Sequence, residues 1–148
     1  MRRALTVLIT LLACSVATQP VSGAPTPSPY AGTYVTTRPG AQGTQELLLV
    51  LTPNGQATFT TSFPELVQRL GPGVLPVRET GTWRVRGREV EVRLNAIGLL
   101  PRDGRTQPRR ENKLIVFTFM RCRLSATRYP TELYGEAGLT FEKSGCTE

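Results

Sequence analysis

Residues 45–63 read QELLLVLTPNGQATFTTSF and contain the clearest strand signals in the chain. A first apolar run, residues 45–52, ends at Pro53-Asn54-Gly55, and Asn-Gly accepts the positive φ angles that a tight hairpin turn needs. The run that follows, residues 56–63, alternates apolar and hydroxyl side chains, and this period of two residues is typical of a half-buried strand. The stretch therefore predicts two antiparallel strands joined by a tight turn.

The same period of two residues recurs along the chain from residue 30 onward. It predicts eight short strands, over residues 30–37, 45–52, 56–63, 78–86, 88–95, 112–119, 124–129 and 137–143. Because most of them are joined by tight turns, we expect an all-β domain over residues 30–143. Its most economical form is a small up-and-down antiparallel β-barrel, since closure removes exposed strand edges.

The interior of an eight-stranded barrel is either filled by side chains or just wide enough for one small ligand. We assign Phe59, Trp83, Phe117 and Phe141 to this interior, and their bulk favours a solid core. A small apolar ligand is the alternative. Trp83 is interpreted as a packing residue at the bottom of the barrel.

Two connections are longer than a tight turn. Residues 64–70 begin with proline and are followed by glycine, which predicts one or two helical turns. Residues 97–111 hold two prolines and four arginines, namely Arg102, Arg105, Arg109 and Arg110. These arginines are candidates for contact with anionic lipid headgroups or with an acidic partner. The alternative is a solvated loop with no binding role.

The amino-terminal residues have the composition of an export signal. Arg2 and Arg3 precede an uncharged, mostly apolar segment that is too short for a membrane-spanning helix, so we expect a signal peptide over residues 1–13. The sequence Leu11-Leu12-Ala13-Cys14 resembles the lipobox of bacterial lipoproteins. The resemblance implies that the Cys14 thiol receives diacylglycerol and holds the protein at a membrane. The alternative is ordinary cleavage after Ala17, which yields a secreted protein.

Residues 14–29 are rich in Ala, Thr, Ser and Pro, and they predict a flexible tether between the lipid and the barrel. If Cys14 carries the lipid, Cys122 and Cys146 remain as a pair in an oxidising compartment, which predicts a disulfide. Such a bridge adds about 3 kcal/mol to stability by closing a loop. Two free thiols are the alternative. Residues 144–148 are expected to be a carboxy-terminal tail.

The charge balance and the missing histidine bear on function. The formal net charge is +7, from 18 Lys and Arg against 11 Asp and Glu, but the basic residues are scattered along the strands. Nucleic-acid binding needs them clustered on one face, so we do not expect it. The chain has no histidine, which removes the commonest general base and a common metal ligand. We expect no catalysis, metal site or cofactor. An enzyme would depend on carboxylates such as Glu46, Glu65, Glu79 or Glu132.

The order of the motifs resembles the amino-terminal domain of NlpE-type envelope lipoproteins. The match is carried by Tyr30-Ala-Gly-Thr-Tyr34, by residues 47–57 and by Glu79-Thr80-Gly81-Thr82-Trp83, while residues 133–141 are similar to the end of lipocalin-like lipoproteins. The resemblance implies a lipocalin-like, lipid-anchored barrel of the cell envelope. That family carries a Leu-Pro-Cys-x-x-Cys pattern in its first loop. Residues 38–43 here lack both cysteines, so a copper role is not transferred.

These observations predict a non-catalytic lipoprotein of the bacterial cell envelope that faces the periplasm or the exterior. Its barrel is expected to act as a binding or interaction module, for a small apolar ligand or for another envelope protein. An inhibitor of an envelope-attacking hydrolase is the first alternative. A freely secreted periplasmic protein is the second.

Overall fold

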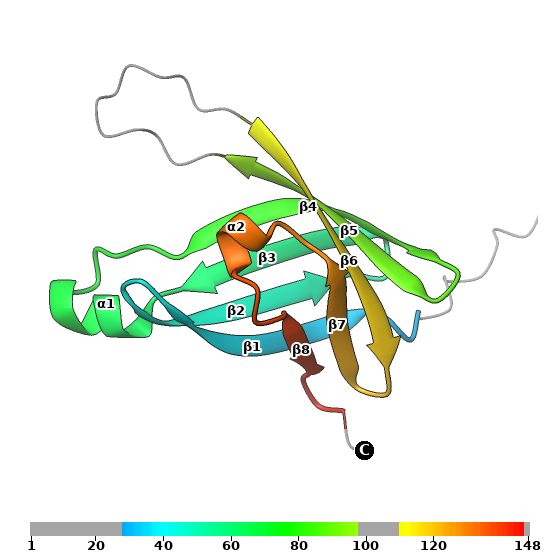
Figure 1. Ribbon diagram of the computed structural model, residues 1–148, viewed down its shortest axis with the longest axis horizontal. Helices are drawn as coiled ribbons and strands as arrows, with labels where there is room; N and C mark the ends of the chain where they lie inside the picture. Colours follow the sequence, from blue (N-terminus) through cyan, green and yellow to red (C-terminus); the bar gives the residue numbers. More distant parts are fainter. Residues whose placement is uncertain (1–27, 98–109, 147–148) are drawn as a thin grey trace, which may run out of the picture.

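The computed structural model describes residues 28–97 and 110–146, which form a closed barrel of eight antiparallel strands. Each strand pairs with its neighbours in chain order, and the last strand pairs back with the first, so the predicted up-and-down barrel is confirmed (Figure 1). The strands are β1 (Gly32–Gly40), β2 (Gly43–Leu51), β3 (Gln56–Ser62), β4 (Val77–Arg86), β5 (Glu89–Ile97), β6 (Arg110–Met120), β7 (Arg123–Arg128) and β8 (Thr140–Lys143).

Two short helices accompany the strands. Helix α1 (Pro64–Leu70) follows β3 and confirms the expected helical turns, with proline in its first turn and Gly71 just after its end. Helix α2 (Thr131–Tyr134) lies between β7 and β8, where we had expected no helix. In the part of the chain that the structure describes, neither helix has the length and apolar character needed to cross a bilayer.

The alternation of strand directions separates the barrel into two ends. One end, which we name the base, holds the first residue of β1 and the three tight turns β2–β3, β4–β5 and β6–β7. The opposite end, which we name the mouth, holds the β1–β2 turn, both helices and the connection between β5 and β6. In Figure 1 the mouth lies toward the left, with α1.

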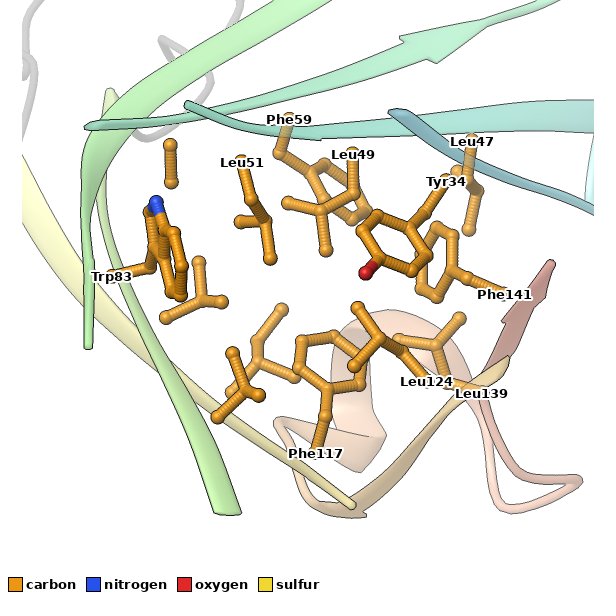
Figure 2. Close-up of a cluster of buried hydrophobic side chains, with 14 of the residues drawn as sticks. Tyr34, Leu47, Leu49, Leu51, Phe59, Trp83, Phe117, Leu124, Leu139 and Phe141 are labelled. Atoms are coloured by element: carbon orange, nitrogen blue, oxygen red, sulfur yellow. The ribbon is translucent and has the colours of Figure 1, made fainter. Parts of the chain in front are cut away.

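The interior of the barrel is packed with side chains. Figure 2 shows that they converge on the barrel axis from every side. The rings of Phe59 and Phe117 both contact the ring of Phe141 edge to face, with centroids 6.0 and 5.8 Å apart. All four residues assigned to the core from the sequence are buried, and they are joined by Tyr34, Leu47, Leu49, Leu51, Val90, Val92, Leu94, Ile115, Leu124, Tyr134 and Leu139. The predicted solid core agrees with this packing.

Trp83 closes the base of the barrel, as its interpretation as a bottom residue requires. Its indole Nε1 donates a hydrogen bond to the carbonyl of Thr52 at 2.8 Å, and its backbone N–H donates to the carbonyl of Gly55. Gly55 has a φ of 83°, in the region that glycine favours, as the Asn-Gly turn signal predicted. The side chain therefore joins the core to the β2–β3 turn.

The first strand was predicted to end at residue 37, but it continues to Gly40, so this boundary was wrong. Pro39 stands opposite Thr44 in the β1–β2 register, yet β1 continues to Gly40. Proline is tolerated in an edge position because its missing N–H faces away from the neighbouring strand. The last strand was also predicted wrongly, since it begins at Thr140 and residues 137–139 lie outside it.

The connection between the fifth and sixth strands is shorter than predicted. Residues 97–111 were expected to form a loop, but β5 extends to Ile97 and β6 begins at Arg110. The strands pair across Ile97 and Arg110, so the paired hairpin reaches further toward the mouth than the sequence pattern indicated. Arg102, Arg105 and Arg109 lie outside the described residues.

Candidate functional site

The barrel closes through a short ladder between its first and last strands. In the part of the chain that the structure describes, only Tyr34–Lys143 and Val35–Glu142 pair in the register of β1 with β8. The same register would next pair Thr36 with Phe141, and this pair does not form among the described residues. Strand β1 continues to Gly40, so within residues 28–97 and 110–146 its mouth half has β2 on one side and no strand on the other. We name the place where the two strands part the seam.

The backbone groups of Thr37 face this seam. The carbonyl of Thr33 accepts a hydrogen bond from the N–H of Ser144, just past β8. Along a regular strand the N–H and C=O of every second residue point to the same edge, so those of Val35, Thr37 and Pro39 point there as well. Thr37 therefore presents a donor and an acceptor beyond the last β1–β8 pair. Pro39 presents only its carbonyl.

A groove of about 640 Å³ runs along the outside of the barrel at the seam. Its side chains are mixed, with apolar groups from Val35 and Leu48, hydroxyls from threonine and serine, and carboxylates from Glu46 and Glu142. The residues that line it are Val35, Thr36, Thr37, Glu46, Leu47, Leu48, Ser62, Thr140 and Glu142. Val35 is 41% exposed, so part of the apolar lining is open to a partner.

The sequence carried a signal for this groove that the strand pattern did not use. Residues 47–51 read LLLVL, a continuous apolar run in which alternation is lost. Leu47, Leu49 and Leu51 point inward and are buried, whereas Leu48 and Val50 lie on the outer face. A strand that is apolar on both faces is typical of a strand that is buried on both faces, by other parts of the protein or by a partner. Leu48 lines the groove, so the outer apolar positions mark a surface suited to contact.

Arg38 fixes the mouth side of the seam from within. Its Nη2 donates to the carbonyl of Leu133 in α2 at 2.8 Å, and its Nε donates to the side-chain carbonyl of Gln45 at 2.8 Å. The guanidinium also lies 5.1 Å from the ring centroid of Tyr134. Helix α2 is therefore joined to β1 by the Arg38 side chain.

A buried ion pair lies inside the mouth. Lys113 Nζ on β6 is 2.5 Å from Glu79 Oε1 on β4, and both side chains are at least 85% covered. The ammonium also faces the ring of Tyr134, 5.7 Å from its centroid. Burial raises the pKa of the Tyr134 hydroxyl, and the Glu79 carboxylate adds to the effect. Glu79 and Lys113 therefore neutralise each other, and the contact of Lys113 with Tyr134 holds α2 in the mouth.

The carboxylates on which an enzyme would depend have separate environments. Glu79 is buried in its ion pair, while Glu46 lines the outer groove. Glu65 on α1 accepts hydrogen bonds from the hydroxyl and backbone N–H of Thr44, which lower its pKa. Glu132 lies exposed on α2. The structure brings no two of these four together in one groove or hydrogen-bonded cluster of the described residues.

The predicted disulfide is present. Cys122 in the β6–β7 turn is bonded to Cys146, with 5.8 Å between their Cα atoms. The bridge ties the residues after β8 to the base, next to the Ser144–Thr33 hydrogen bond. Among the other predicted site residues, Cys14 lies outside the described range. Arg110 is the first residue of β6, at the mouth.

The outer face of β4 and β5 carries a second charged surface. Arg84 donates to the Glu91 carboxylate at 2.7 Å, and Arg86 lies 3.7 Å from its other oxygen. The hydrogen bond from Arg84 lowers the pKa of Glu91, and the nearby charges of Arg86 and Arg93 act in the same direction. Glu91 is therefore already paired, and the arginines around it give this face an excess of positive charge.

Comparison of the chain with protein-family models, with curated proteins and with solved structures found no match.

Proposed function

We propose that the chain is a lipid-anchored protein of the bacterial cell envelope whose barrel binds another protein on its outer surface. The lipid is placed on Cys14, and residues 14–29 form the tether. Binding at the seam groove is the function of the domain, and no chemical step is assigned to it.

The observation that carries this proposal is the contrast between a filled interior and a groove on the outside. Phe59, Phe117 and Phe141 are fully buried, and Phe141 contacts the other two rings, so a small apolar ligand inside the barrel would have to displace core side chains. The seam groove needs no such displacement and combines apolar contact area with polar groups, which is the usual composition of a protein-binding surface.

The opposite positions of the base and the mouth bear on the connection between β5 and β6, whose arginines are candidates for contact with lipid headgroups or with a partner. They favour a partner. The described chain enters at the base, beside the disulfide, whereas Ile97 and Arg110 lie at the mouth. A lipid at Cys14 is joined through the tether to the base of the barrel. The connection between β5 and β6 starts and ends at the opposite end, away from the attachment of the tether.

The anchor is tested by the intact mass of the full-length protein made in a bacterial host. We expect loss of residues 1–13, the added mass of a diacylglyceryl group on the Cys14 thiol, and a further loss of two hydrogens for the Cys122–Cys146 bond. A Cys14→Ser variant should leave the membrane fraction. A mature product that begins at Thr18 and carries no lipid would overturn the proposed anchor.

The binding surface is tested by a photo-crosslinking amino acid introduced in living cells. Placed at Leu48, in the groove, it should capture a discrete protein partner. Placed at Glu89, on the outer face of β5, it serves as the matched control and should give no such adduct. Equal adducts from both positions, or none from Leu48, would contradict a partner at the groove.

A further inference from the structure

We propose that the partner enters the seam groove as an extended segment with basic side chains and adds as a strand to the mouth half of β1. This inference rests on the proposed function, because it takes the groove as the partner site and names the chemistry that the groove recognises. Strand addition of this kind uses main-chain hydrogen bonds for affinity and side-chain pockets for specificity.

The edge that such a segment needs is available at β1. The β1–β8 ladder stops at Val35, and β1 continues to Gly40. The N–H and C=O of Thr37 and the C=O of Pro39 face the seam, so an incoming strand can form a pair opposite Thr37. Pro39 limits the pairing to a few residues, as proline does on natural sheet edges. The site therefore suits a short segment and resists unlimited edge-to-edge association.

The groove beside this edge has room for alternate side chains of the segment. In an added strand every second side chain points to the outer face of the barrel. There it meets Val35 and Leu48 on one side and Thr140 and Glu142 on the other. The side chains of the other set point toward α2, where Arg38 already bonds to Leu133, so small residues fit at those positions.

The charge of the groove selects basic side chains. Glu46 and Glu142 are both exposed and both line it, in a chain whose formal net charge is +7. Glu142 Oε1 also forms an ion pair with Arg123 Nε at 2.7 Å, and Arg123 lies on β7, on the side of β8 away from β1. A second copy of this chain, paired edge to edge about Thr37, would bring two more of these carboxylates into the same space. A basic segment neutralises them instead, so it is favoured over a homodimer.

The test uses a display library of random decapeptides selected on the full-length, folded protein. We expect the enriched peptides to carry Lys or Arg at every second position and no proline between them. Thr37→Pro removes the N–H at the seam and should weaken their binding about tenfold, whereas Thr37→Val keeps the N–H and should not. Glu46→Lys should weaken binding by a similar factor, and Glu89→Lys on the far face is the matched control.

Urea denaturation of each variant shows whether the fold is retained, and Glu46→Lys provides the test if Thr37→Pro fails to fold. Enriched peptides without a basic excess would overturn the inference, as would equal binding to Glu46→Lys and Glu89→Lys. If the in-cell partner still crosslinks at Leu48 but its capture is unaffected by Thr37→Pro in a folded protein, strand addition is wrong while the proposed function stands. If no partner crosslinks at Leu48 but the peptides bind and depend on Thr37 and Glu46, the proposed function is wrong while strand addition stands.

Discussion

The base and the mouth of this barrel are closed in different ways. The base is closed by three tight turns, by the Trp83 side chain and by the Cys122–Cys146 bond, all of which lie at this end of the core. At the mouth, two helices and the buried pair of Glu79 and Lys113 take their place, and β1 parts from β8. The base thus depends on burial and a covalent link, whereas the mouth depends on charges with specific partners and leaves a strand edge free.

This difference separates stability from binding within one small domain. At the apolar base, small substitutions are tolerated, but removal of a large buried side chain strongly lowers the free energy of unfolding. A buried ion pair contributes little as a pair, yet it is costly to break because one charge is left without its partner. The free edge of β1 can exist because the rest of the barrel does not depend on it. Mutations at the two ends should therefore differ in how much they lower the free energy of unfolding and in whether a second substitution restores it.

The largest effect is expected at the base. Trp83→Ala removes the indole that closes the barrel and its bond to the Thr52 carbonyl, and it should lower the free energy of unfolding by about 4 kcal/mol. Val85→Ala, two residues later on β4, is the matched control and should cost less than about 1 kcal/mol because Val85 is 39% exposed. Urea denaturation of the full-length protein measures both. Equal costs would contradict the assignment of Trp83 as the closing residue.

At the mouth we expect a loss that a second substitution restores. Lys113→Met leaves the Glu79 carboxylate buried without its partner and should cost about 3 kcal/mol. The double variant Glu79→Leu with Lys113→Met removes both charges and should recover most of that loss, which the same urea denaturation would show. Additive losses in the double variant would mean that the two residues act through packing and not as a pair.

Much of the fold, but less of the candidate site, could be predicted from the sequence. The alternation in residues 56–63 and the Asn54-Gly55 signal predict β3 and its turn because they depend on neighbours in the chain. Helix α2 and the length of β8 depend on contacts between distant residues, such as Arg38 with Leu133, and no local pattern encodes them. The groove exists because the β1–β8 ladder ends at Val35–Glu142 although β8 extends back to Thr140. Only the unbroken apolar run at residues 47–51 indicated it.

A smaller effect is expected from alkaline pH, through one buried tyrosine toward each end. Burial raises the pKa of Tyr34 to about 12, and burial with the nearby Glu79 carboxylate raises that of Tyr134 as well. The stabilisation is complete below the unfolded value of about 10 and is lost as the pH rises through the folded values. The urea midpoint should therefore fall above about pH 10, and less in the double variant Tyr34→Phe with Tyr134→Phe. An equal fall in the double variant would contradict these pKa values.

The smallest effect on stability is expected at the exposed ion pair of the seam. Arg123 Nε lies 2.7 Å from Glu142 Oε1, as short as the contact between Arg84 and Glu91, but both side chains are more than half exposed. Water screens such a pair, so Glu142→Gln should change the free energy of unfolding by less than about 0.5 kcal/mol in urea denaturation. A loss above about 1 kcal/mol would show that Glu142 holds the barrel closed. Because its bond to Arg123 costs so little to give up, Glu142 can turn to an incoming basic side chain without opening the β1–β8 ladder.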